Sequence, residues 1–167
     1  SIKSNKRFFH YGLAEGIAKG LNILTVILLA SFANLEVYAE IALLIASELI
    51  FIELILAGQQ NVVLRFIQKT KSNVEQVIAR CSINIFLSFT IIFIFFSFLP
   101  LEIYLSILAK DLKLEYLTLL IGSFFMAVIN LNLNRLRKED KVTQYSSIRI
   151  FLQVIKFILC LFFMSIF

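Results

Sequence analysis

Three polar side chains recur along one side of the first long apolar run of the chain. Glu15, Lys19 and Asn22 are spaced four and three residues apart, so they share one face of an α-helix. Lys19 lies about 16 Å along a helix that begins at Phe8, which is too deep for easy snorkelling. The stripe predicts either a self-neutralising Glu15–Lys19 pair or the lining of a hydrated cavity. Ionisable residues inside a membrane mark substrate or ion paths by default, which favours the cavity.

The last apolar run carries a similar stripe of Arg149, Gln153, Lys156 and Cys160. Arg149 is close enough to the membrane edge to snorkel. Lys156 lies about 12 Å into a run that begins at Ile148, and no acidic residue lies within one helical turn of it. Its partner is therefore expected from another helix or from a ligand. Six residues of the two stripes form the predicted substrate cavity: Glu15, Lys19, Asn22, Arg149, Gln153 and Lys156.

Two carboxylates, Glu48 and Glu53, fall inside the second apolar run. They differ by about 140° around a helix axis, so both cannot face the same partner. We expect one to pair with a lysine and the other to titrate or face water. Both are candidates for ion coupling or for ion pairing.

Three glycines, Gly12, Gly16 and Gly20, lie at a spacing of four in the first run. This spacing places them on one side of the helix, roughly 90° from the polar stripe. Glycine at such positions allows two helices to approach closely, so the stripe predicts a helix-packing face rather than a ligand site.

Catalytic and metal-binding patterns are missing from the sequence. It contains no Ser/His/Asp set, no glycine-rich phosphate loop and no cluster with metal-ligand spacing. Cys81 and Cys160 share no ligand-like spacing with each other or with the single histidine, His10. The sequence therefore predicts neither an enzyme nor a cofactor-binding protein.

The elements that carry these residues are predicted to be transmembrane helices. Apolar residues make up 60% of the 167 residues and charged residues 16%, a composition that a soluble domain of this size does not show. Continuous apolar runs of about 20 residues predict helices, because barrel strands alternate apolar and polar residues over about ten. The fold class is therefore all-α, a polytopic transmembrane helix bundle with about five spans. The spans are predicted at residues 8–32, 38–57, 75–99, 114–133 and 148–167.

Basic residues in the gaps set the predicted orientation. Alternate gaps, beginning with the N-terminus, hold ten lysines and arginines, against two in the others. Because basic residues are retained inside, the N-terminus is expected in the cytoplasm. The net charge of +5 arises mostly from these gaps and not from a basic face with stacking aromatics, which argues against nucleic-acid binding.

The two ends and one linker add further expectations. The chain begins without methionine and stops within apolar sequence, so we expect it to be the N-terminal part of a longer bundle, with no soluble domain. Pro100 closes the third run, and residues 101–109 predict a short interfacial helix.

Taken in order, several features resemble one membrane protein family. They are a basic start, Tyr11-Gly12-Leu13, the hairpin at 34–38, the helix end at 57–58, the amphipathic stretch 63–67 and the basic stretch 134–141 before Tyr145. This order resembles the lipid-linked oligosaccharide flippases of the multidrug/oligosaccharidyl-lipid/polysaccharide exporter superfamily. The hairpin departs from the family pattern, since Asn34-Leu35 stands where a Gly-Pro pair is usual and Ala39 where a glycine is usual.

The resemblance implies a multi-pass protein of the bacterial cytoplasmic membrane. Its substrate would be an undecaprenyl-diphosphate-linked oligosaccharide, moved between leaflets for the synthesis of surface polysaccharide such as O-antigen. Its partners would be membrane lipid and either the missing C-terminal helices or a second copy. Two alternatives stay open: a drug or ion antiporter of the same superfamily, and a membrane scaffold subunit whose buried charges serve helix pairing alone.

Overall fold

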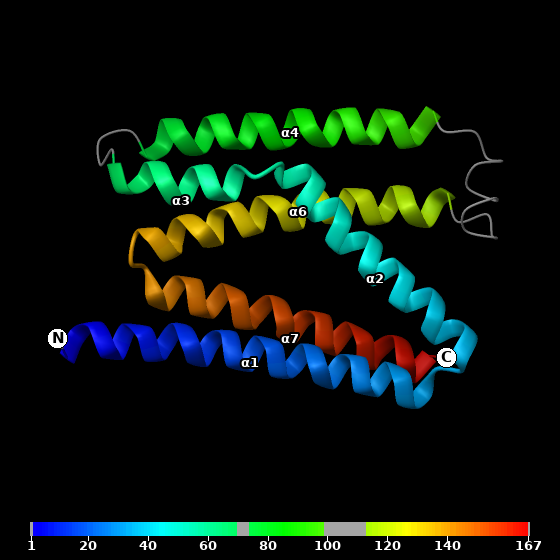
Figure 1. The fold of residues 1–167 in the computed structure, drawn as a ribbon. Coiled ribbons are helices and arrows are strands. Elements are labelled where there is room, and N and C mark those ends of the chain that lie inside the picture. The colour runs from blue at the N-terminus through cyan, green and yellow to red at the C-terminus, as the bar shows by residue number, and fades with distance from the viewer. Residues whose placement is uncertain (1, 70–73, 99–112, 167) are drawn as a thin grey trace. The chain divides into compact units, whose positions relative to one another are not determined.

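The computed structural model describes residues 2–69, 74–98 and 113–166, and in these ranges the chain is helical apart from short turns. The interfacial helix predicted at 101–109 lies outside the described residues. The helices follow one another as α1 (Ile2–Phe32), α2 (Leu35–Leu56), α3 (Gln59–Lys69), α4 (Val74–Phe98), α6 (Lys113–Lys138) and α7 (Val142–Ile166) (Figure 1).

The length and apolarity of these helices confirm the predicted fold class. Among the described residues, four segments are long and apolar enough to cross a membrane: Phe9–Phe32, Val74–Phe98, Tyr116–Lys138 and Val142–Phe162. A fifth span results if Val37–Leu56 and Gln59–Phe66, which meet at an angle of 51°, count as one bent helix. The chain is thus an all-α, polytopic helical protein.

The last two helices extend further than the sequence predicted. The stretch 134–144 was expected to be a polar linker, whereas α6 continues to Lys138 and α7 begins at Val142. The turn between them is a Schellman-type helix end. Asp140 adopts a left-handed φ of 57°, and the amide of Lys141 donates to the carbonyl of Leu136 at 3.0 Å.

The described chain divides into two compact units, with the divisions inside α2 and inside α6. The first unit comprises residues 1–41 and 136–167, and the second comprises residues 42–135.

In the first unit, α1 and α7 lie side by side and run in the same direction (Figure 1). The α1 positions that α7 covers recur at alternating spacings of three and four residues, the heptad pattern of helices crossing at a shallow angle. Ala14 and Ala18 lie at the centre of this pattern and are 1% and 4% exposed. Their small side chains allow α7 to approach closely. The ring of Tyr145 on α7 is also buried and packs edge-on against that of Tyr11, with ring centroids 5.2 Å apart.

This seam differs from the packing face that the glycines predicted. A Cβ atom added at Gly12, Gly16 or Gly20 would have no neighbour within 4 Å. Gly16 and Ala18 are about 200° apart around the helix, so the glycine stripe faces away from α7. The close helix contact of α1 therefore lies at its alanines, and close packing at the glycines stays a prediction.

In the second unit, apolar side chains of α2, α3, α4 and α6 form one core. Phe51 packs its ring edge-on against Phe96 of α4, with centroids 5.1 Å apart, and Phe89 packs on Phe124 of α6 at 4.6 Å. Each of the four helices contributes a fully buried side chain to this core: Ile55, Val63, Ile85 and Leu120.

The helices α3 and α4 form an antiparallel pair in this unit (Figure 1). The sequence had marked residues 63–67 as amphipathic, and the helix that contains them begins earlier, at Gln59. Val63 is buried, so this side of α3 faces the core. Arg65 and Phe66 are exposed and lie on the parts of the helix that the core does not cover.

Candidate functional site: a polar seam between α1 and α7

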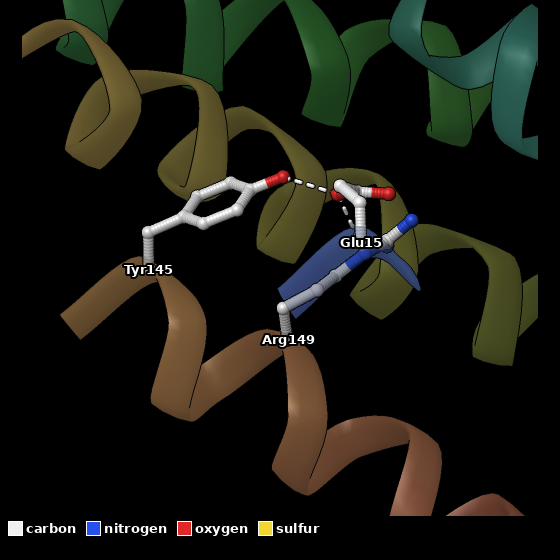
Figure 2. Close-up of polar contacts among 3 residues, drawn as sticks. All are labelled: Glu15, Tyr145 and Arg149. Atoms are coloured by element: carbon white, nitrogen blue, oxygen red, sulfur yellow. Dashed lines mark hydrogen bonds and ion pairs between the residues drawn. The ribbon is translucent and has the colours of Figure 1, made fainter. Parts of the chain in front are cut away.

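The two predicted polar stripes face one another across the α1–α7 seam. The Tyr145 hydroxyl donates a hydrogen bond to Oε1 of Glu15 (Figure 2). Arg149 Nε lies 3.2 Å from the same oxygen, in an ion pair. One acidic side chain of α1 is therefore held by two side chains that lie one turn apart on α7.

A second polar contact continues the seam toward the C-terminal ends of both helices. The side-chain amide of Gln153 donates to Oδ1 of Asn22 at 3.1 Å. Asn22 lies seven residues after Glu15 and Gln153 lies four after Arg149, so both contacts fall on the same side of the pair. The seam thus carries a charged layer and, deeper in the candidate spans, a neutral amide layer.

The helices position these groups because their polar residues flank the alanine seam. Glu15 directly follows Ala14 in the sequence, and both it and Arg149 have side chains 33% exposed. The pair is therefore shielded on one side by the packed helices and open on the other. Beside Nε, the guanidinium of Arg149 carries four N–H donors on its two Nη atoms.

Tyr145 was not among the predicted site residues. It lies one turn before Arg149, which lies one turn before Gln153, so the stripe on α7 begins earlier than expected. Tyr145 lies before the last predicted span, which began at residue 148, and the helical spacing of these three residues is the signal that would have found it.

The remaining cavity candidates have different surroundings. Lys19 is exposed, and no ion pair joins it to Glu15 among the described residues. Lys156 is exposed and has at least one interaction partner.

The two acidic candidates of α2 belong to the second unit. Glu48 is half-buried and has at least one interaction partner. Glu53 is exposed and accepts a hydrogen bond from the side-chain amide of Gln60 at 3.4 Å.

A hollow of about 750 Å³ lies beside the first turns of α7. Asp140, Thr143, Ser146 and Ser147 line it together with His10 and with apolar side chains further along α7. The Ser146 hydroxyl is buried and has no hydrogen-bond partner among the described residues. The lining changes from polar to apolar along the helix. A membrane shows the same change from its headgroup region to its acyl chains.

In the part of the chain that the structure describes, no group of three or more His, Cys, Asp or Glu residues is arranged so that it could hold a metal ion. Comparison with protein-family models, with curated proteins and with solved structures finds no match for the chain. The structure therefore defines a class, an all-α polytopic protein whose apolar helices could span a membrane.

Proposed function

We propose that the chain belongs to a membrane transporter that moves an anionic, lipid-linked sugar substrate between leaflets. The observation that carries this proposal is the polar seam, in which Glu15 of α1 contacts Tyr145 and Arg149 of α7 within two candidate spans. Ionisable groups at such positions are costly in lipid and typically line substrate or ion paths. A transporter needs such a path, whereas helix association alone can use apolar and small residues.

The chemistry of the seam suits a diphosphate attached to a sugar. Arg149 carries four N–H donors on its two Nη atoms, and guanidinium groups bind phosphate oxygens in a bidentate manner. Lys19 and Lys156 add positive charge along the same two helices. The amides of Asn22 and Gln153 offer neutral donors and acceptors for sugar hydroxyls.

The lipid part of such a substrate also has a suitable environment. The hollow beside α7 joins polar residues, Asp140 among them, to apolar side chains such as Phe151. A chain whose head is polar and whose tail is hydrocarbon would match both parts of this lining.

Together with the family resemblance, these features favour an undecaprenyl-diphosphate-linked oligosaccharide as the substrate and the bacterial cytoplasmic membrane as the location. The chain would act as a flippase in surface polysaccharide synthesis and not as an enzyme, with further helices or a second copy completing the path. An antiporter of the same superfamily would instead use the Glu15 carboxylate to carry a coupling ion.

The mutual neutralisation of Glu15 and Arg149 favours a second candidate, a scaffold subunit in which this pair serves helix association alone. Paired substitutions separate the two. In the native host, Arg149→Gln should lower protein abundance in the membrane, because it strands the carboxylate of Glu15. The double variant Glu15→Gln/Arg149→Gln should restore abundance in both cases, since no charge is left unpaired.

Export of surface polysaccharide then decides between the two functions. A transporter that uses Arg149 to bind substrate predicts that the double variant is abundant but defective in export, and that Arg149→Lys keeps part of the export. Lys156→Ala should also reduce export, and Lys156→Arg should keep part of it. Normal export by an abundant double variant would reject the proposed role of the seam.

A further inference from the structure

The junction between α2 and α3 is a helix break that combines a carboxylate with several amide groups. Helix α2 ends at Leu56, and the next two residues, Ala57 and Gly58, have left-handed φ angles of 45° and 74°. The amide of Ala57 donates to the backbone carbonyl of Glu53 at 3.0 Å, so α2 ends in a left-handed cap. The last carbonyl groups of α2 then have no donor from the helix itself and point out of its end.

Side chains bridge this break. Gln60, in the first turn of α3, donates to Oε2 of Glu53 in the last turn of α2 at 3.4 Å. Its neighbour Gln59 accepts a hydrogen bond from Asn84 of α4, also at 3.4 Å. Both contacts are longer than the usual 2.9–3.0 Å, and a half-turn of the Gln60 amide would present its oxygen in place of its nitrogen. The first pair joins the two helix ends, and the second fixes α3 against α4.

The break lies alongside a candidate membrane span. Asn84 is ten residues after the start of α4 at Val74, about 15 Å along that helix. A carboxylate at such a position is unfavourable unless a cation or a proton compensates its charge. None of the described lysines and arginines forms an ion pair with Glu53.

The electrostatics of the break favour a cation over an anion. The C-terminal end of α2 carries partial negative charge, and no basic residue lies in its last turn. Glu53 adds a full negative charge at that same end. Although the N-terminus of α3 is partly positive, the carboxylate beside it would repel a phosphate or another anion.

From this arrangement we infer a binding site for one sodium-sized monovalent cation, coordinated by the carboxylate of Glu53, the side-chain oxygen of Gln60 and the terminal carbonyls of α2. Broken transmembrane helices coordinate monovalent cations through free carbonyls in this way. A single carboxylate among neutral oxygens gives the site a net charge of −1, which suits a monovalent ion better than Ca²⁺ or Mg²⁺. Gln59 and Asn84 act as positioning residues that keep α3 in place.

The test is equilibrium binding of radioactive sodium to the purified full chain in lipid nanodiscs. We expect saturable binding that excess unlabelled sodium displaces and that choline leaves unchanged. Glu53→Gln and Gln60→Leu should each weaken sodium binding by about tenfold or more, because each removes a coordinating oxygen or its charge. Asn84→Ala should weaken it less, since it acts through the position of α3. The matched control is Glu75→Gln, which neutralises an exposed carboxylate on α4 and should leave binding unchanged.

A second measurement covers variants that fold poorly. Sodium chloride should raise the unfolding temperature of the wild-type chain above its value in choline chloride, and should raise that of Gln60→Leu less. Absence of saturable sodium binding by the wild type, including the case in which Glu53 is simply protonated, would overturn the proposal. So would full binding by Glu53→Gln. Because binding is measured without transport, either result is independent of the export experiments on the α1–α7 seam.

Discussion

Arg149 Nε on α7 lies 3.2 Å from Oε1 of Glu15 on α1, and these residues are separated by most of the chain. The contact joins the first and last described helices, which run in the same direction (Figure 1). In helices that cross a membrane, parallel direction requires both helices to begin on the same side. One ion pair thus connects the chemistry of the polar seam with the topology of the chain.

The hydrogen bond from Tyr145 to Glu15 should stabilise the seam. We expect Tyr145→Phe to lower the free energy of unfolding by about 1.5–3 kcal/mol, the range for hydrogen bonds to charged groups. Tyr11→Phe is the matched control, because its hydroxyl makes a long contact of 3.4 Å with the backbone carbonyl of Arg137 and should contribute less. Unfolding in mixed detergent micelles measures both variants. Equal losses would show that the Tyr145 hydroxyl has no special role.

The seam geometry predicts which small residues of α1 tolerate a larger side chain. Ala18→Leu should destabilise the α1–α7 pair by about 1–3 kcal/mol, because Ala18 is 4% exposed and the leucine would force the helices apart. Gly16→Leu should change stability by less than about 0.5 kcal/mol, since an added Cβ there meets no neighbour within 4 Å. Thermal unfolding of the two variants in nanodiscs tests the contrast. A larger loss for Gly16→Leu would show that a close helix neighbour covers the glycine face.

Substitutions at the two residues of the turn between α2 and α3 should have different effects on stability. Gly58 has a φ of 74°, so Gly58→Ala should cost about 1 kcal/mol through the contact of its Cβ with the backbone. Ala57 is an L-residue at a φ of 45°, so Ala57→Gly should relieve strain and leave stability equal to or above that of the wild type. The same unfolding assay reads both. If Gly58→Ala were neutral, the left-handed break would not be needed for folding.

The sequence predicted the helical class because a continuous apolar run long enough to span lipid leaves little choice of structure. It also predicted the two polar stripes, since helical spacing alone places Glu15 with Asn22 and Arg149 with Gln153. It did not predict that these stripes face each other, because pairing between distant helices depends on which faces pack. Glycine spacing suggested one packing face of α1, but the heptad pattern through Ala14 and Ala18 determined the observed one.

The positive charges and the parallel direction of α1 and α7 together predict the orientation of the chain in the membrane. The basic N-terminal residues and the basic stretch 134–141 lie at the starting ends of these two helices, and basic residues are retained in the cytoplasm. Single cysteines replacing Glu36, which follows α1, and Asp140, which precedes α7, should therefore lie on opposite sides of the membrane. In a background with Cys81→Ser and Cys160→Ser, an impermeant maleimide applied to intact cells should label the cysteine at position 36 and spare the one at 140.

Permeabilised cells provide the control, in which both positions should be labelled. Equal labelling of the two in intact cells would rule out this orientation, and labelling at 140 alone would reverse it.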